Sequence, residues 1–279
     1  MRRDGVLIPF ATYDGKRWGN SWTGPAFDLQ IPITLDRVPS RWWGPTKALA
    51  DWQVWTGGAA PVPARVTQPD WIEAHCLRQI ALKTNYRSTR AAPPPTEQPY
   101  PKDGLAVAPP QAIERIEQVP VDSTEALELH GVVLESFNRA ERLTENRFGH
   151  PVKQRVRDQV DVTLEAIYAY GSAPRVYYVE AGRGYTTGFE KTDQCSIAFG
   201  TGWFERDAQR TIRKLDMAVD LLRCTRYGAT YMLPLGVVRL DGRSFWLVQY
   251  SGWDHERFVV IEVKKDNVVA AVSAWGGGC

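Results

Sequence analysis

The sequence predicts an α+β protein, with a mainly antiparallel β-meander or partial barrel, one long helix packed on it, and a Trp/Pro-rich N-terminal β segment. Two patterns carry this prediction. One stretch of the chain repeats apolar residues every three or four positions, which is typical of an amphipathic helix. From about residue 160 onward, apolar and polar residues alternate with a period of two, which is typical of strands in an antiparallel sheet.

The first segment, residues 1–90, holds seven of the eleven tryptophans. Residues 7–18 alternate around Asp14 and Gly15, a dipeptide that favours a tight hairpin turn. Residues 27–35 form a short strand interrupted by a proline, which indicates a sheet edge. The pattern of residues 68–85 fits either a short helix or a strand, and periodicity does not separate the two.

Seven prolines fall among residues 91–110. Because proline disfavours helices and central strands, this stretch is interpreted as an extended linker or surface strap. Residues 111–279 then hold the helix and the antiparallel sheet, onto which residues 1–90 are clasped.

The helix is expected over residues 122–147. Asp122 at the N-cap and Glu125 three positions later form a capping-box pattern. An apolar stripe follows, consisting of Ala126, Leu129, Val133, Phe137, Ala140 and Leu143. Gly149 and Pro151 end the helix.

Eight strand-like segments follow residue 160. In residues 244–250 both faces are apolar, which indicates a central strand covered on both sides. The long helix is the expected cover for one of those faces.

Composition excludes several classes of function. The net charge is +2, with +5 in residues 1–90 and −3 in the remainder, which argues against a nucleic-acid surface. No apolar run approaches the ~20 residues of a transmembrane helix, and the basic N-terminus lacks the apolar stretch of a signal peptide. The chain is therefore expected to be cytoplasmic, or extracytoplasmic (periplasmic or secreted) if a leader has been removed.

No cofactor or metal is expected. The four histidines are far apart in sequence, without the spacing that builds a metal site on one element. Gly182, Gly184 and Gly188 miss the spacing of a dinucleotide-binding loop, and the residues after them are not helical in pattern. Residues 251–257 gather Ser251, Asp254, His255 and Glu256. In an extended strand Asp254 and Glu256 would face one way and His255 the other, so a polar hairpin loop is the interpretation.

Three glutamates in aromatic-rich strands are the candidates for catalysis: Glu165, Glu180 and Glu205. Glycoside hydrolysis needs two carboxyl groups roughly 5–10 Å apart across a sugar cleft. The structural alternative is an ion pair, for example between Glu180 and Arg183.

Four tryptophans, Trp42, Trp43, Trp52 and Trp55, are the candidates for binding a ligand or partner. Each ring can bury roughly 150–250 Å². We expect most of them to dock onto the protein's own sheet. The alternatives are a protein interface and a surface for stacking sugars.

Cys195 and Cys224 are expected to form a disulfide. If the two flanking strands form a hairpin in which Asp207 faces Ile212, the numbers of opposite residues add up to 419, and the two cysteines face each other. Opposite residues lie within the Cα separation that a disulfide accepts. A meander that continues onward would bring Cys279 to the same edge as a competitor.

The absence of a nucleophile, metal or phosphate motif favours a non-catalytic binding or assembly protein. The competing hypothesis is a carbohydrate-binding protein or a carbohydrate-active hydrolase that uses the strand glutamates. A protein or a glycan is the expected partner.

Overall fold

The computed structural model describes residues 1–20, 33–34, 38, 51–56, 60–74, 76–90, 103–108, 111–186 and 195–278. Antiparallel strands dominate, and one long helix packs on a sheet, so the predicted α+β class is confirmed. The chain forms two compact units. Unit 1 comprises residues 1–115, 230–263 and 269–279, and unit 2 comprises residues 116–229 and 264–268. No helix in the described ranges is long and apolar enough to cross a membrane.

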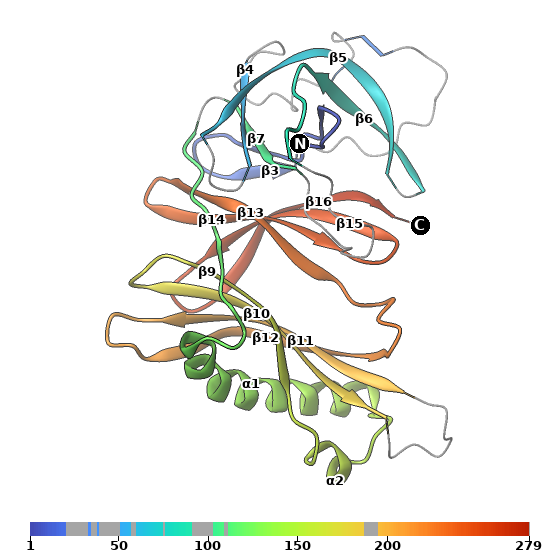
Figure 1. Ribbon diagram of the computed structural model, residues 1–279, viewed down its shortest axis with the longest axis vertical. Coiled ribbons are helices and arrows are strands. Elements are labelled where there is room, and N and C mark those ends of the chain that lie inside the picture. The colour runs from blue at the N-terminus through green and yellow to red at the C-terminus, as the bar shows by residue number, and fades with distance from the viewer. Residues whose placement is uncertain are drawn as a thin grey trace. The chain divides into compact units, whose positions relative to one another are not determined.

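Unit 1 contains two larger sheets and a small hairpin (Figure 1). The first sheet has the order β1-β6-β5-β4-β7, with bounds β1 Val6–Leu7, β4 Asp51–Trp55, β5 Val62–Ala74, β6 Leu77–Thr84 and β7 Leu105–Val107. The second sheet is a meander of β13 Tyr231–Leu240, β14 Arg243–Ser251, β15 His255–Val263 and β16 Val268–Gly278. The hairpin pairs β2 Ala11–Tyr13 with β3 Trp18–Asn20.

Local sequence explains the N-terminal part of this unit. The Asp14 carboxylate accepts hydrogen bonds from the backbone N–H groups of Lys16 and Arg17, and Gly15 takes a positive φ of 92°, so the predicted turn is confirmed. Residues 68–74 and 77–84 are strand, because β5 and β6 pair antiparallel. Within residues 91–110 the structure describes 103–108, which include β7. Of residues 27–35, only 33 and 34 are described.

The N-terminal segments pack on the β13–β16 sheet through aromatic and aliphatic side chains. Phe10 stacks on Phe258 with ring centroids 5.3 Å apart. Trp18 meets Phe245 edge-on at 5.5 Å. The core of unit 1 therefore joins residues from both ends of the chain.

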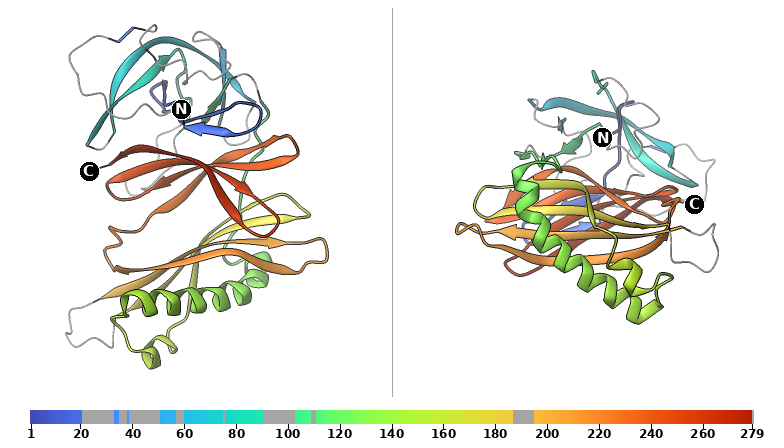
Figure 2. Two further views of the ribbon diagram at one scale, coloured as in Figure 1. Left: turned by 180° about the vertical axis from the view of Figure 1, so that it is seen from behind. Right: turned by 60° about the horizontal axis from the view of Figure 1, so that its bottom comes forward.

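Unit 2 is a five-stranded meander with helix α1 along one face, as Figure 2 shows. Its strands are β8 Glu117–Gln118, β9 Thr163–Tyr170, β10 Arg175–Tyr185, β11 Ser196–Arg206 and β12 Ile212–Arg223, and a short helix, α2, spans Gln154–Arg157. Helix α1 spans Thr124–Phe148 and buries Ala126, Leu129, Val133, Phe137 and Ala140 in the core of this unit.

Two details of the helix prediction are wrong. The N-cap is Ser123, whose hydroxyl accepts a hydrogen bond from the N–H of Ala126, and not Asp122. Leu143 is 61% exposed. Thr144, four residues after Ala140, is half-buried instead, and its hydroxyl donates to the backbone oxygen of Val219 at 2.7 Å.

The expectation of one continuous meander is also wrong. Strand β12 ends the sheet of unit 2, and β13 begins a separate sheet in unit 1. Strand β14 is central, between β13 and β15, as predicted, and Phe245 to Gln249 are all buried. The helix, however, packs on the sheet of unit 2, chiefly against β12 and β11, and not on the sheet that contains β14.

Candidate functional site

Two of the three candidate glutamates are held in ion pairs. Both carboxylate oxygens of Glu165 accept hydrogen bonds from Arg226, at 2.6 and 2.7 Å. Glu205 accepts two from Arg213, at 2.8 and 3.2 Å, and Arg213 also pairs with Asp266. Both observations favour the structural interpretation, in which these carboxylates form ion pairs.

Glu180 is buried on β10, on the face of the sheet opposite to α1. Together with burial, which is the larger cause, its negative charge raises the pKa of Tyr168 to about 12. Arg183 lies three residues further along the strand and extends from the other face. It donates to Glu141 on α1 at 2.8 Å, so it does not form the predicted ion pair with Glu180.

Glu141 is the centre of a buried cluster beneath α1. It accepts hydrogen bonds from the hydroxyl of Tyr185 and from Arg183. His150 accepts the N–H of Val152 at its Nδ1, so its Nε2 carries the proton and faces Glu141 at 3.4 Å. Burial opposes ionisation, but these hydrogen bonds and the charge of Arg183 outweigh it and hold the pKa of Glu141 below its usual range. The cluster fastens the helix to the sheet.

The structure describes two of the four candidate tryptophans. Trp52 is buried in the core of unit 1, and Trp55 on the same strand, β4, is half-buried. Trp42 and Trp43 lie outside the described residues. Neither described ring is an open platform.

A different group of aromatic and polar side chains lies where β14 turns into β15. Its members, called here the aromatic tip, are Thr230, Trp253, Asp254, His255 and Trp275. Trp253 lies in the turn and is 69% exposed, and Trp275 on β16 is 44% exposed. The rings of His255 and Trp275 stack almost in parallel, with centroids 5.8 Å apart and an interplanar angle of 3°.

Hydrogen bonds fix the imidazole at the tip. Its Nδ1 lies 2.9 Å from a carboxylate oxygen of Asp254, and its Nε2 lies 3.3 Å from the hydroxyl of Thr230. A Cβ atom at Gly252 would stand 2.3 Å from this ring, so only glycine allows the chain to turn so closely around it. The imidazole is thereby held flat against Trp275.

Sequence patterns do not predict this group. Ser251, Asp254 and His255 are neighbours in the sequence, but the hydroxyl beside the imidazole comes from Thr230, 25 residues before His255 in the chain. The exposure of Trp275 does have a sequence signal. Val272 and Ala274 are buried, so strict alternation turns the next residue toward the other face of β16.

The predicted disulfide between Cys195 and Cys224 is present, with a Cα separation of 5.6 Å. Cys76 is also disulfide-bonded. The bridge closes the open end of the β11–β12 hairpin, next to the pair Ser196 and Arg223, whose numbers add up to 419 as expected. Cys279, the proposed competitor, lies outside the described residues.

A scan against protein-family models and searches of curated proteins and solved structures find no match to this chain.

Proposed function

We propose that the protein is a non-catalytic binding protein and that the aromatic tip binds a saccharide. The observation that carries the proposal is the parallel stack of His255 on a partly exposed Trp275, with the more exposed Trp253 in the adjoining turn. Covering large, rigid, exposed aromatic rings with another apolar surface is favourable, because it removes apolar area from contact with water. The C–H face of a pyranose ring is such a surface.

The polar groups at the tip can form hydrogen bonds with the hydroxyl groups around a sugar ring. Asp254 accepts hydrogen bonds, Thr230 donates and accepts, and the imidazole can do both according to its tautomer. A few polar groups around an apolar platform are what fixes the orientation of a small ligand. The tip also contains a single carboxylate, whereas glycoside hydrolysis requires two.

The bonding of the three strand glutamates supports binding over hydrolysis. Two of them are neutralised by arginines, and the third is buried within the sheet. The disulfides further support an extracytoplasmic location, because cytosolic thiols normally stay reduced.

Affinity electrophoresis tests the proposal. The protein would be run in native gels that contain laminarin, xylan, galactomannan or dextran, followed by titration calorimetry with the polysaccharide that retards it. We expect Trp275→Ala and Trp253→Ala to weaken binding at least tenfold. Phe148→Ala is the matched control, because this ring is 80% exposed in unit 2.

Two results would count against the proposal. If none of these gels, and no member of a broad glycan array, retains the wild-type protein, the ligand is not a saccharide. If Trp275→Ala binds as well as the wild type, the saccharide binds elsewhere.

A further inference from the structure

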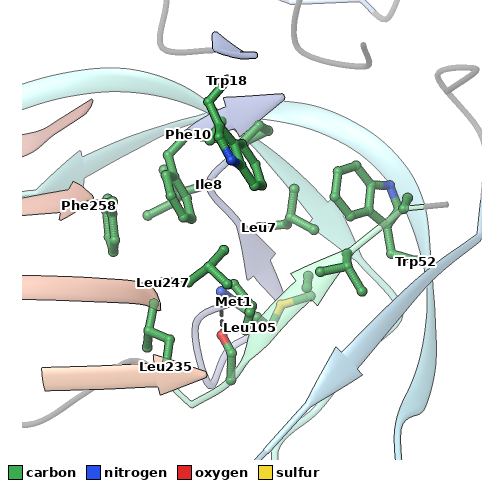
Figure 3. Close-up of a pocket in the computed structure, with 16 residues that line it drawn as sticks. Met1, Leu7, Ile8, Phe10, Trp18, Trp52, Leu105, Leu235, Leu247 and Phe258 are labelled. Carbon is green, nitrogen blue, oxygen red and sulfur yellow. Dashed lines mark hydrogen bonds between the residues drawn. The ribbon is translucent and has the colours of Figure 1, made fainter. Parts of the chain in front are cut away.

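Unit 1 contains a partly open, mainly apolar cavity of about 110 Å³ between its two larger sheets (Figure 3). Its walls come from N-terminal segments on one side and from β13, β14 and β15 on the other. Large side chains that face it include Leu7, Phe10, Trp18, Trp52, Leu247 and Phe258. All of these residues belong to unit 1.

The cavity is too large to be an ordinary packing gap. Protein interiors contain few voids larger than one water molecule, for which about 10–15 Å³ suffices. A buried water also needs two to four polar partners. None of the described residues that line this cavity has a charged side chain, and the ammonium group of Met1, at its wall, already donates to the backbone oxygen of Gly104 at 2.9 Å. Such a space does not hold ordered water well.

Four aromatic side chains contribute to walls that are otherwise mainly aliphatic. Phe10 and Phe258 stack on each other, and Trp18 is fixed edge-on against Phe245. The indole N–H groups of Trp18 and Trp52 are buried and have no acceptor among the described residues. An indole N–H can be satisfied by the π face of an aromatic ring as well as by an oxygen.

We propose that this cavity binds one small uncharged aromatic molecule, about the size of benzene or phenol. Engineered cavities of about 150 Å³ with similar aliphatic and aromatic walls stay dry and bind benzene. The volume here admits a single six-membered ring and excludes a fatty-acyl chain. The positive charge of the Met1 ammonium group at the wall disfavours an amine, since none of the described lining residues offers an anionic side chain to pair with it. This site is separate from the aromatic tip, and the proposal does not depend on saccharide binding.

Titration calorimetry of the full chain with benzene, phenol and decanoate tests the proposal. The wild-type protein should bind benzene or phenol saturably with one site per chain. Ala106→Phe places a ring in the wall of the cavity and should weaken binding at least tenfold. The control is Ala270→Phe, the same change at an exposed position on β16, which should stay within twofold of the wild type.

A second variant tests the proposal independently in case Ala106→Phe does not fold. Leu247→Ala enlarges the cavity and should shift the preference from benzene toward naphthalene at least tenfold. Three results would overturn the proposal: no saturable binding of benzene or phenol to the wild type, equal binding by Ala106→Phe in its folded form, or tighter binding of decanoate than of either aromatic compound. An unchanged naphthalene-to-benzene ratio in Leu247→Ala would also contradict the assignment of the site.

Discussion

Removal of the Cys195–Cys224 disulfide should destabilise unit 2 by an amount that follows from the length of the loop it closes. The two residues are 29 positions apart. The chain-entropy relation for a loop of this length gives about 12 cal/mol/K, or about 3.6 kcal/mol at 25 °C. The cysteines flank the β11–β12 pair next to Ser196 and Arg223, and we expect most of this stabilisation to act through the unfolded chain.

The variant is Cys195→Ala combined with Cys224→Ala, which leaves no free thiol at the site. Because the chain contains two units, hydrogen exchange in urea, read by mass spectrometry on peptides from β11 and β12, is preferable to a single optical signal. With an m-value of about 2 kcal/mol/M, the midpoint for these peptides should fall by about 2 M. Thr225→Ala, next to the bridge, controls for local changes in polarity. A midpoint within roughly 0.3 M of the wild type, which is the limit of the measurement, would refute the loop-entropy reasoning.

Two further predictions concern the packing of α1 on its sheet. Glu141→Gln leaves a buried guanidinium without its counter-charge and should cost about 3–5 kcal/mol in the free energy of unfolding. Because the pKa of Glu141 is lowered from its ordinary 4.5, the extra stability of the wild type is present above about pH 4.5 and is lost as the pH falls through the lowered pKa. Unfolding curves of both proteins across pH 2–7 would show this loss. A difference in stability that does not depend on pH would contradict the assignment. Gly200→Ala should cost about 1–3 kcal/mol in urea unfolding, because its Cβ would stand 2.7 Å from the ring of Phe137. Gly184→Ala is the control, since a Cβ there meets nothing within 4 Å, and an equal loss in both variants would exclude a steric cause.

Local patterns in the sequence predict the helix and the strands. The ends of these elements depend on which of several neighbouring side chains makes the capping or packing contact. Asp122 and Ser123 are both good N-cap residues, and only the hydroxyl of Ser123 meets the free N–H of Ala126. The exposure of Leu143 has a similar cause. A spacing of three or four residues is compatible with either Leu143 or Thr144 as the next inward position, and the helix turns Thr144 inward.

The disulfide was predicted correctly although one step in its register was wrong. Ile212 faces Arg206 and not Asp207. Trp203 faces Asp216 while Phe204 faces Lys214, so Leu215 is an extra residue in β12 that forms a bulge and restores the expected pairing beyond it. A bulge has no clear signal in an alternating sequence, and the two deviations cancel by the time the strands reach the cysteines.

The division of the strands between two sheets and the composition of the aromatic tip both depend on long-range contacts. The alternation in β12 and β13 is the same, although these strands belong to different sheets. The path of the chain before β13 brings Thr230 next to His255. The periodicity of the sequence does not predict this path.

The interruption of unit 1 by unit 2 has a consequence for the newly made chain as it leaves the ribosome. Trp18 packs on Phe245, and the 227 residues from 19 to 245 take about 11–45 s to translate at 5–20 residues per second. During that interval the N-terminal strands have no β13–β16 sheet to cover them, whereas residues 116–229 emerge together and hold nearly all of unit 2. The later part of the chain can thus fold before the earlier part. The nascent N-terminal half, rich in tryptophan, is then the segment that most needs protection from aggregation.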